Sequence, residues 1–108
     1  RQAGVGGMAA YSAAKAGVIG LSKAVARELG SYGVTCNVIS PGAIDTPMLR
    51  RSIERGAIAA TRDTTRAVTL MGRIGTVEEI SAAALYYISK EASFVTGQVL
   101  GVNGGEYM

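Results

Sequence analysis

The chain has 108 residues, of which 48% are hydrophobic, and its formal net charge is +3. This size and composition indicate one folded domain and exclude a disordered chain. Six arginines and only two acidic residues lie in the segment 47–75, which has no aromatic residue and therefore favours a small anionic ligand over nucleic acid. The apolar runs are much shorter than the ~20 residues that span a bilayer, so we expect no membrane partner.

Histidine is absent and Cys36 is the only cysteine. No internal disulfide can form, which fits a reducing cytosol, and we expect a cytoplasmic protein in which Cys36 is a buried small hydrophobic residue. Histidine-based triads and imidazole ligands are excluded, so we expect no metal site. Because the chain begins at Arg1 and enters a helix almost directly, we expect it to be a piece of a longer chain.

Residues 9–31 have a helical pattern that ends in the glycines at 30 and 33. The predicted helix has one face with Tyr11, Lys15, Val18, Ser22, Val25 and Leu29, and an opposite face with Ala13, Gly17, Gly20 and Ala24. A glycine inside a helix costs roughly 1 kcal/mol relative to alanine, so two on one face suggest the close approach of another helix. The alternative is chance in an alanine-rich helix.

Tyr11 and Lys15 are four residues apart, so a helix places them one above the other. A nearby ammonium group favours the phenolate form of a tyrosine, which would make Tyr11 a usable proton donor or acceptor. The spacing alone is weak evidence, because an exposed aromatic residue beside a solvated lysine is the commoner outcome.

Residues 34–40 predict a short strand whose apolar character is typical of a central, parallel strand covered on both faces. The loop Pro41-Gly-Ala-Ile-Asp-Thr-Pro47 follows at its carboxyl end, where open parallel sheets bind their ligands. Gly42 permits close backbone approach, and Thr46 offers a hydroxyl for a ligand or for capping the next helix.

Residues 48–72 suggest one or two short helices, broken at Gly56, that form either a mobile lid or solvated helix faces. Thr76 and Glu79 form a capping box at the start of another helix. Its predicted buried stripe consists of Ile80, Ala83, Ala84, Tyr87 and Ile88. Residues 97–102 then predict a last strand, followed by a turn at 103–105, which makes the chain part of an α/β fold.

Four motifs in this order resemble the short-chain dehydrogenase/reductase family, single-domain type, over essentially the whole chain. They are Tyr11-Ser-Ala-Ala-Lys15-Ala-Gly17, Asn37-Val-Ile-Ser-Pro41-Gly42-Ala-Ile44-Asp-Thr46, Gly72-Arg73-Ile-Gly75-Thr-Val-Glu78-Glu79, and Phe94-Val-Thr96-Gly97-Gln98 with Val102-Asn103-Gly104-Gly105. The resemblance implies that residues 1–108 are the carboxyl-terminal portion of one NAD(P)-binding, Rossmann-like domain with a doubly wound parallel sheet.

The resemblance implies a carbonyl–alcohol oxidoreductase that uses NADP or NAD. Tyr11 would be the general acid/base, and Lys15 would bind the nicotinamide ribose and favour the ionised Tyr11. Pro41, Gly42, Ile44 and Thr46 would line the nicotinamide end, with the Ile44 backbone and the Thr46 hydroxyl near its carboxamide. In this family the Tyr11 helix commonly forms a dimer interface, which implies a homodimer or homotetramer.

Other parts of the family pattern are not found in the chain: the glycine-rich pyrophosphate turn, the residue that selects NAD or NADP, an Asn and the catalytic Ser. We therefore expect the fragment alone to be inactive.

Within the family, the chain looks most like 3-oxoacyl-[acyl-carrier-protein] reductases of fatty acid biosynthesis, and the arginines at 47–75 would suit an acidic carrier protein. Tyr32 departs from this pattern, because such enzymes often have a basic residue there. A general alcohol or sugar dehydrogenase of the same family, or a truncated non-catalytic association module, stays open as an alternative.

Overall fold

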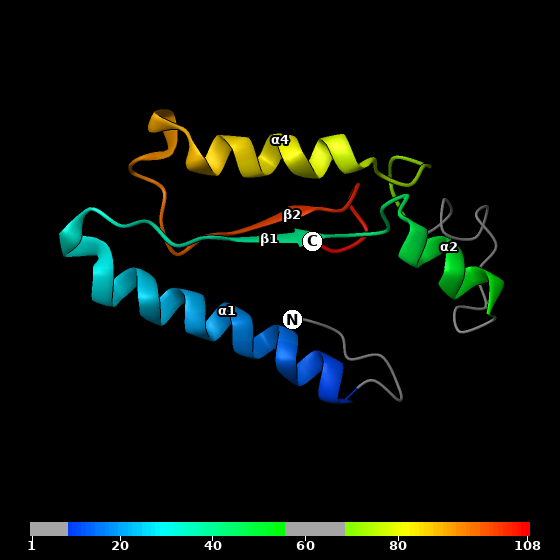
Figure 1. The fold of residues 1–108 in the computed structure, drawn as a ribbon, viewed down its shortest axis with the longest axis horizontal. Coiled ribbons are helices and arrows are strands. Elements are labelled where there is room, and N and C mark those ends of the chain that lie inside the picture. Colours follow the sequence, from blue (N-terminus) through cyan, green and yellow to red (C-terminus); the bar gives the residue numbers. More distant parts are fainter. Residues whose placement is uncertain (1–8, 56–68) are drawn as a thin grey trace. The chain divides into compact units, whose positions relative to one another are not determined.

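The computed structural model describes residues 9–55 and 69–108. The chain divides into two units, one comprising Arg1–Val38 with Ser93–Val99 and the other Ile39–Ala92 with Leu100–Met108. The helices and strands are, in chain order, α1 (Ala9–Leu29), β1 (Val38–Pro41), α2 (Pro47–Glu54), α4 (Val77–Ile88) and β2 (Val99–Val102), with short 3-10 turns at Gly30–Tyr32 and Lys90–Ala92 (Figure 1).

The helix α1 confirms the predicted helix and its end. Its many alanines have the highest helix propensity and offset the two glycines, and Gly33 ends the following turn with a left-handed φ of 75°. The less exposed side of α1 overlaps the predicted Tyr11 face only in part. Ser22 and Val25 of that face are half-buried, and the side extends beyond it to the half-buried Ser12 and Ile19 and the buried Ala26. Ala26 packs closely on Gly97, where an added Cβ would lie 3.8 Å from the Ala26 Cβ.

The strands β1 and β2 pair with each other, and the residue numbers of the paired residues increase in the same direction along both strands, so the strands run parallel. The Val38 amide donates to the Gln98 carbonyl at 2.8 Å, and the Gly42 amide donates to the Val102 carbonyl at 3.1 Å. Helices and a parallel pair of strands confirm the α/β class. In the described part of the chain β1 pairs only with β2, and its residues are half-buried or exposed instead of fully covered.

The strand predicted from residue 34 begins four residues later, at Val38. Before Val38, side-chain hydrogen bonds take the place of part of the regular backbone hydrogen bonding between the two segments. The Asn37 side-chain Nδ2 donates to the Val95 carbonyl at 2.8 Å, and its Oδ1 accepts from the Gln98 backbone amide at 3.0 Å. The Cys36 backbone amide donates to the Thr96 hydroxyl. Cys36 itself is half-buried, not buried as predicted.

The helix α4 begins at the predicted capping box. The Glu79 amide donates to the Thr76 hydroxyl at 3.3 Å, and the Thr76 amide donates to the Glu79 carboxylate at 2.8 Å. The predicted buried stripe is wrong in part: its residues at 80, 83 and 87 are half-buried, whereas Ala84 and Ile88 are exposed. The helical spacing of the apolar residues of α4 was predicted correctly, but the described residues do not cover the whole apolar face of this helix.

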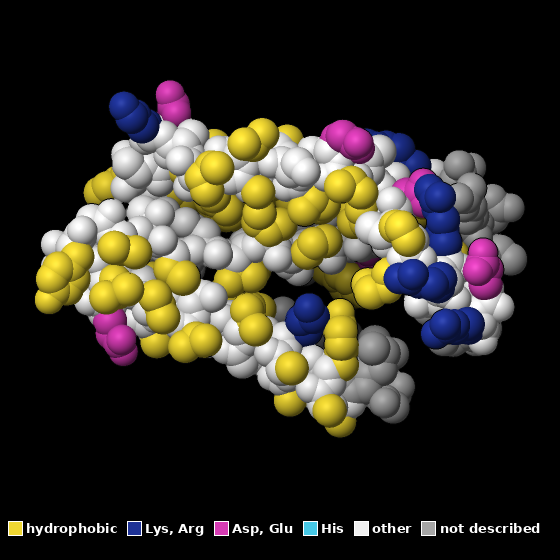
Figure 2. All heavy atoms as spheres, viewed as in Figure 1, with side chains coloured by type: hydrophobic (Ala, Val, Ile, Leu, Met, Phe, Trp, Pro, Cys, Tyr) yellow, Lys and Arg dark blue, Asp and Glu magenta, His cyan; other side chains and the backbone are white. Residues whose placement is uncertain are grey.

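Large apolar side chains remain on the surface throughout the described residues. Only Ala26, Ala92 and Thr69 are buried there, whereas Leu21 is 66% exposed and Phe94 is fully exposed. Figure 2 shows such hydrophobic side chains on the visible sides of α1 and of α4. Among residues 9–55 and 69–108, no helix combines the length and apolar character that a membrane span requires.

An ion pair reinforces the start of α4. The Arg73 guanidinium donates to the Glu79 carboxylate, with Nη1 3.0 Å from Oε2, and the same oxygen accepts the Thr76 amide. The bond to Arg73 and then the bond to the Thr76 backbone lower the pKa of Glu79 from 4.5 to about 2. Glu79 therefore stabilises the folded state while its carboxylate is ionised.

We predict that replacing Glu79 with Gln changes how stability depends on pH. Because the folded-state pKa is the lower one, the carboxylate contributes stability that is complete above about pH 5 and is lost as the pH falls to about 2. Melting temperatures of the intact protein and of Glu79→Gln should differ most near about pH 6 and converge on acidification. A gap of constant size over this range would contradict the assignment.

Candidate active site

The predicted catalytic pair lies on α1, in the first unit. The Lys15 Nζ atom is 5.2 Å from the centroid of the Tyr11 ring, a distance at which an ammonium group interacts favourably with an aromatic face. Tyr11 is 57% exposed, so its hydroxyl can reach a bound molecule. The four-residue spacing thus brings the two side chains together as predicted, while their catalytic roles stay predictions.

The predicted cofactor loop lies in the second unit, directly after β1. Pro41 ends the strand and is exposed, and Gly42 packs against the carboxyl-terminal turn. A Cβ atom at Gly42 would lie 2.7 Å from the Asn103 Cβ and 2.7 Å from Glu106 Oε2. Real Cβ atoms do not approach so closely, so the position requires glycine for close backbone packing within this chain.

The other side of the loop is bound to Gly75. The Gly75 amide donates to the Ala43 carbonyl at 2.9 Å, and the Asp45 amide donates to the Gly75 carbonyl at 3.0 Å, which forms an isolated parallel bridge between Ile44 and Gly75. In such a bridge the peptide groups of alternate residues point in opposite directions. The N–H and C=O groups of Ile44 therefore point away from Gly75.

Thr46 caps α2, which confirms the structural alternative for this residue. Its hydroxyl oxygen accepts the Leu49 amide at 3.2 Å, and Pro47 follows it at the first helical position. A hydroxyl has one proton to donate in addition to its acceptor capacity, so the cap leaves Thr46 able to donate to a ligand. Next to it, Asp45 Oδ1 accepts from Arg50 Nε at 2.9 Å.

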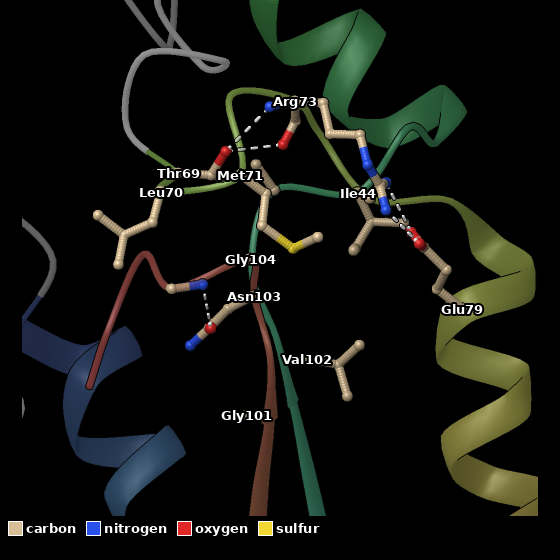
Figure 3. Close-up of a pocket in the computed structure, with 13 residues that line it drawn as sticks. Ile44, Thr69, Leu70, Met71, Arg73, Glu79, Gly101, Val102, Asn103 and Gly104 are labelled. Atoms are coloured by element: carbon tan, nitrogen blue, oxygen red, sulfur yellow. Dashed lines mark hydrogen bonds and ion pairs between the residues drawn. The ribbon is translucent and has the colours of Figure 1, made fainter.

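A hollow of about 460 Å³ lies beside the loop, within the second unit. Figure 3 shows Ile44, Met71 and Val102 among its lining residues, with the Arg73–Glu79 pair at the start of α4. Ile44 is the one residue of the predicted site that lines this hollow. The lining is mainly apolar, which suits the uncharged part of a ligand.

The arginines predicted to meet an anionic partner fall into three groups. Arg50 and Arg73 are paired with Asp45 and Glu79. Arg51 and Arg55 are exposed at α2 and line a shallow hollow with Met48 and Ser52. Arg62 and Arg66, with most of the predicted lid, lie outside the described residues.

Sequence reasoning missed the part that the carboxyl-terminal turn plays in this loop. The Ala43 amide donates to Glu106 Oε2 at 3.2 Å, across 63 positions of the chain. The only signal in the sequence was an acidic residue directly after the Asn103-Gly-Gly turn. No group of three or more potential metal-ligating side chains occurs in residues 9–55 and 69–108.

The comparisons with known proteins agree with the motifs. A family model described as enoyl-(acyl carrier protein) reductase matches residues 1–106. The 3-oxoacyl-[acyl-carrier-protein] reductase FabG of Escherichia coli is 47% identical over 97% of this chain, and that of Thermotoga maritima is 40% identical over 92%. The chain spans only about two fifths of the length of these curated relatives: 41% and 38%, respectively.

Solved structures show the same fold. The NADPH-dependent reductase YwfH, involved in bacilysin biosynthesis, matches 85% of this chain and 37% of its own length, with a TM-score of 0.79 and 30% identity. ElxO with NADP bound matches 89% of this chain and 38% of its own, with a TM-score of 0.78 and 30% identity. A short-chain dehydrogenase family protein from Francisella tularensis shares the fold at a TM-score of 0.85 and 21% identity, covering 95% of this chain and 45% of its own.

The predicted motifs, the parallel strands and the match of the family model over residues 1–106 lead to one conclusion: this chain belongs to the short-chain dehydrogenase/reductase family, whose fold is Rossmann-like.

Proposed function

We propose that the protein carrying this chain is an NAD(P)-dependent oxidoreductase that interconverts a carbonyl and a secondary alcohol, and that it acts as a 3-oxoacyl-[acyl-carrier-protein] reductase. The observation that carries the proposal is the Tyr11–Lys15 pair, held at 5.2 Å between ammonium and ring in a chain 47% identical to such reductases.

Tyr11 would act as the general acid in the direction of reduction. Its hydroxyl donates a proton to the carbonyl oxygen of the substrate, and in the reverse direction the phenolate accepts the proton of the alcohol. The Lys15 ammonium stabilises the negative charge that forms on the tyrosine oxygen. The exposure of Tyr11 and the proximity of Lys15 support these roles.

The loop Pro41–Thr46 would hold the cofactor at its nicotinamide end. The N–H and C=O groups of Ile44 point away from Gly75, and the Thr46 hydroxyl retains a proton to donate while it caps α2. These donors and acceptors fit a carboxamide, which itself has two donors and one acceptor oxygen. Gly42 supports this fit because it lets the backbone pack closely where the loop begins.

Bound NADPH or NADH would supply the hydride that reduces the carbonyl carbon. YwfH is NADPH dependent and ElxO has NADP bound, so NADPH is the cofactor to test first.

The substrate proposed is a ketone carried on a thioester. The family model is described by an enoyl reduction, which acts on a carbon–carbon double bond, whereas the relatives at 40–47% identity are 3-oxoacyl reductases. High identity over nearly the whole chain is the more specific of the two indications. The exposed Arg51 and Arg55 on and after α2 suit the acidic surface of a carrier protein.

We also propose a homodimer or homotetramer formed through α1. Val18 and Leu21 are 52% and 66% exposed, and, apart from the adjoining backbone of α1 itself, no described atom lies within 4 Å of a Cβ built at Gly17 or Gly20. An open glycine surface beside exposed apolar residues suits the close approach of a second helix. The cytoplasmic location expected from the single cysteine stays a prediction.

We predict that Tyr11→Phe in the intact protein lowers kcat for carbonyl reduction by about 100-fold or more, because general acid catalysis typically contributes that much. Tyr32→Phe, which removes the hydroxyl of another exposed tyrosine, is the control and should leave kcat unchanged. Steady-state rates of NADPH oxidation would test this. Near-normal turnover by Tyr11→Phe would exclude the proposed role of Tyr11, whereas an unsubstituted intact protein that shows no turnover would favour a non-catalytic association module.

The carrier-protein substrate can be tested with Arg51→Glu combined with Arg55→Glu. Reversing two exposed charges should raise KM for a carrier-linked 3-oxoacyl substrate by about threefold to tenfold at low salt, and less at high salt. A short 3-oxoacyl thioester without the carrier is the control and should keep its KM. Equal effects on both substrates, or activity only with simple alcohols or sugars, would favour a general dehydrogenase.

The assembly can be tested with Gly20→Gln. The larger side chain meets open space within the described chain, so it should leave the fold intact but weaken a contact made at the glycine surface. Analytical ultracentrifugation should then show smaller species than for the intact protein at the same concentration. Glu28→Gln places the same side chain at another exposed position of α1 as a control. An unchanged distribution for Gly20→Gln would place the interface elsewhere.

A further inference from the structure

The carboxyl-terminal turn, residues 103–106, holds Glu106 in a defined position. Gly104 and Gly105 have φ values of 60° and 82°, which favour glycine, and the Glu106 amide donates to the Asn103 carbonyl at 3.1 Å. The Asn103 side chain fixes the same turn, since its oxygen accepts the Gly105 amide at 3.1 Å (Figure 3). Its Nδ2 also donates to the Tyr107 carbonyl at 2.9 Å.

The segment that precedes α4 also holds this turn, through a hydrogen bond and through side-chain packing. The Met71 amide donates to the Gly104 carbonyl at 3.2 Å, and a Cβ at Gly105 would lie 2.8 Å from Leu70 Cδ1. The turn therefore has little freedom to shift relative to the loop beside it, because both its hydrogen bonds and its packing would have to change.

The Glu106 carboxylate bonds directly to the cofactor loop. Its Oε2 atom accepts the Ala43 amide at 3.2 Å and lies 2.7 Å from the position that a Cβ atom at Gly42 would take. Ala43 is thus held at both of its polar groups, its amide by Glu106 and its carbonyl by the Gly75 amide. The next residue, Ile44, is the one whose peptide groups point away from Gly75.

We propose that Glu106 is a positioning residue for cofactor binding: through the Ala43 amide it holds the Ile44 peptide groups in the orientation that binds the nicotinamide carboxamide. The inference rests on the proposed function, because it names how this chain prepares the same loop. A charged acceptor makes a stronger bond to a backbone amide than a neutral one, so the carboxylate restricts the loop before the dinucleotide arrives.

Three substitutions in the intact protein test the proposal. Glu106→Ala removes the acceptor and should raise the Kd for NADPH by about tenfold, the lower end of the effect of losing one charge-assisted hydrogen bond. Glu106→Gln keeps an acceptor oxygen at the same reach and should recover most of the affinity. Glu91→Ala removes an exposed carboxylate elsewhere and should leave Kd unchanged.

The readouts separate positioning from general destabilisation. Titration calorimetry gives Kd, steady-state kinetics should show a larger change in KM for NADPH than in kcat, and hydrogen exchange should show faster exchange of the Ala43 amide in Glu106→Ala. If NADPH binds normally to Glu106→Ala, or if only its melting temperature changes, the inference is wrong while the proposed function stands. If the unsubstituted intact protein binds neither NADPH nor NADH, the proposed function itself is wrong. Unaltered hydrogen exchange of the Ala43 amide in Glu106→Ala would independently reject the Glu106–Ala43 hydrogen bond.

Discussion

The backbone of the loop after β1 is the constraint on which the candidate site depends. Ala43 donates to Glu106 on one side and accepts from Gly75 on the other, and Asp45 donates back to Gly75. Backbone groups that are paired in this way cannot rotate without losing several hydrogen bonds together. The loop therefore has a defined conformation from its own chain contacts, and the N–H and C=O groups of Ile44 are turned away from Gly75.

Two glycines allow these contacts to form. Gly42 gives room to Asn103 and Glu106, and Gly75 gives room to the Ile44 side chain, whose Cδ1 would lie 2.7 Å from a Cβ there. The Arg73–Glu79 pair and the capping box then hold Gly75 at the start of α4. A residue predicted for cofactor binding thus has a structural reason to be glycine, which does not conflict with a role at the cofactor.

The exposed apolar surface concerns the stability of the chain and its partners. Only three of the described residues are buried, and large side chains of α1 and α4 remain in contact with solvent. Burial of such side chains is the main favourable term in folding and association, worth roughly 25 cal/mol per Å². The surface is therefore consistent with a chain whose apolar faces are completed by further protein, as the proposed assembly through α1 requires.

The sequence by itself determined that helices lie where α1 and α4 are found, and it also determined the capping box, the Tyr11–Lys15 pair and the family, because local spacing and motif order carry that information. The predicted start of β1 was wrong, because the side chains of Asn37 and Thr96 make hydrogen bonds in place of backbone bonds between the strands, and no sequence periodicity reveals this. Only the tertiary structure brought Glu106 to Ala43, because a contact across 63 positions depends on the pairing of β1 with β2 and on the turn after it.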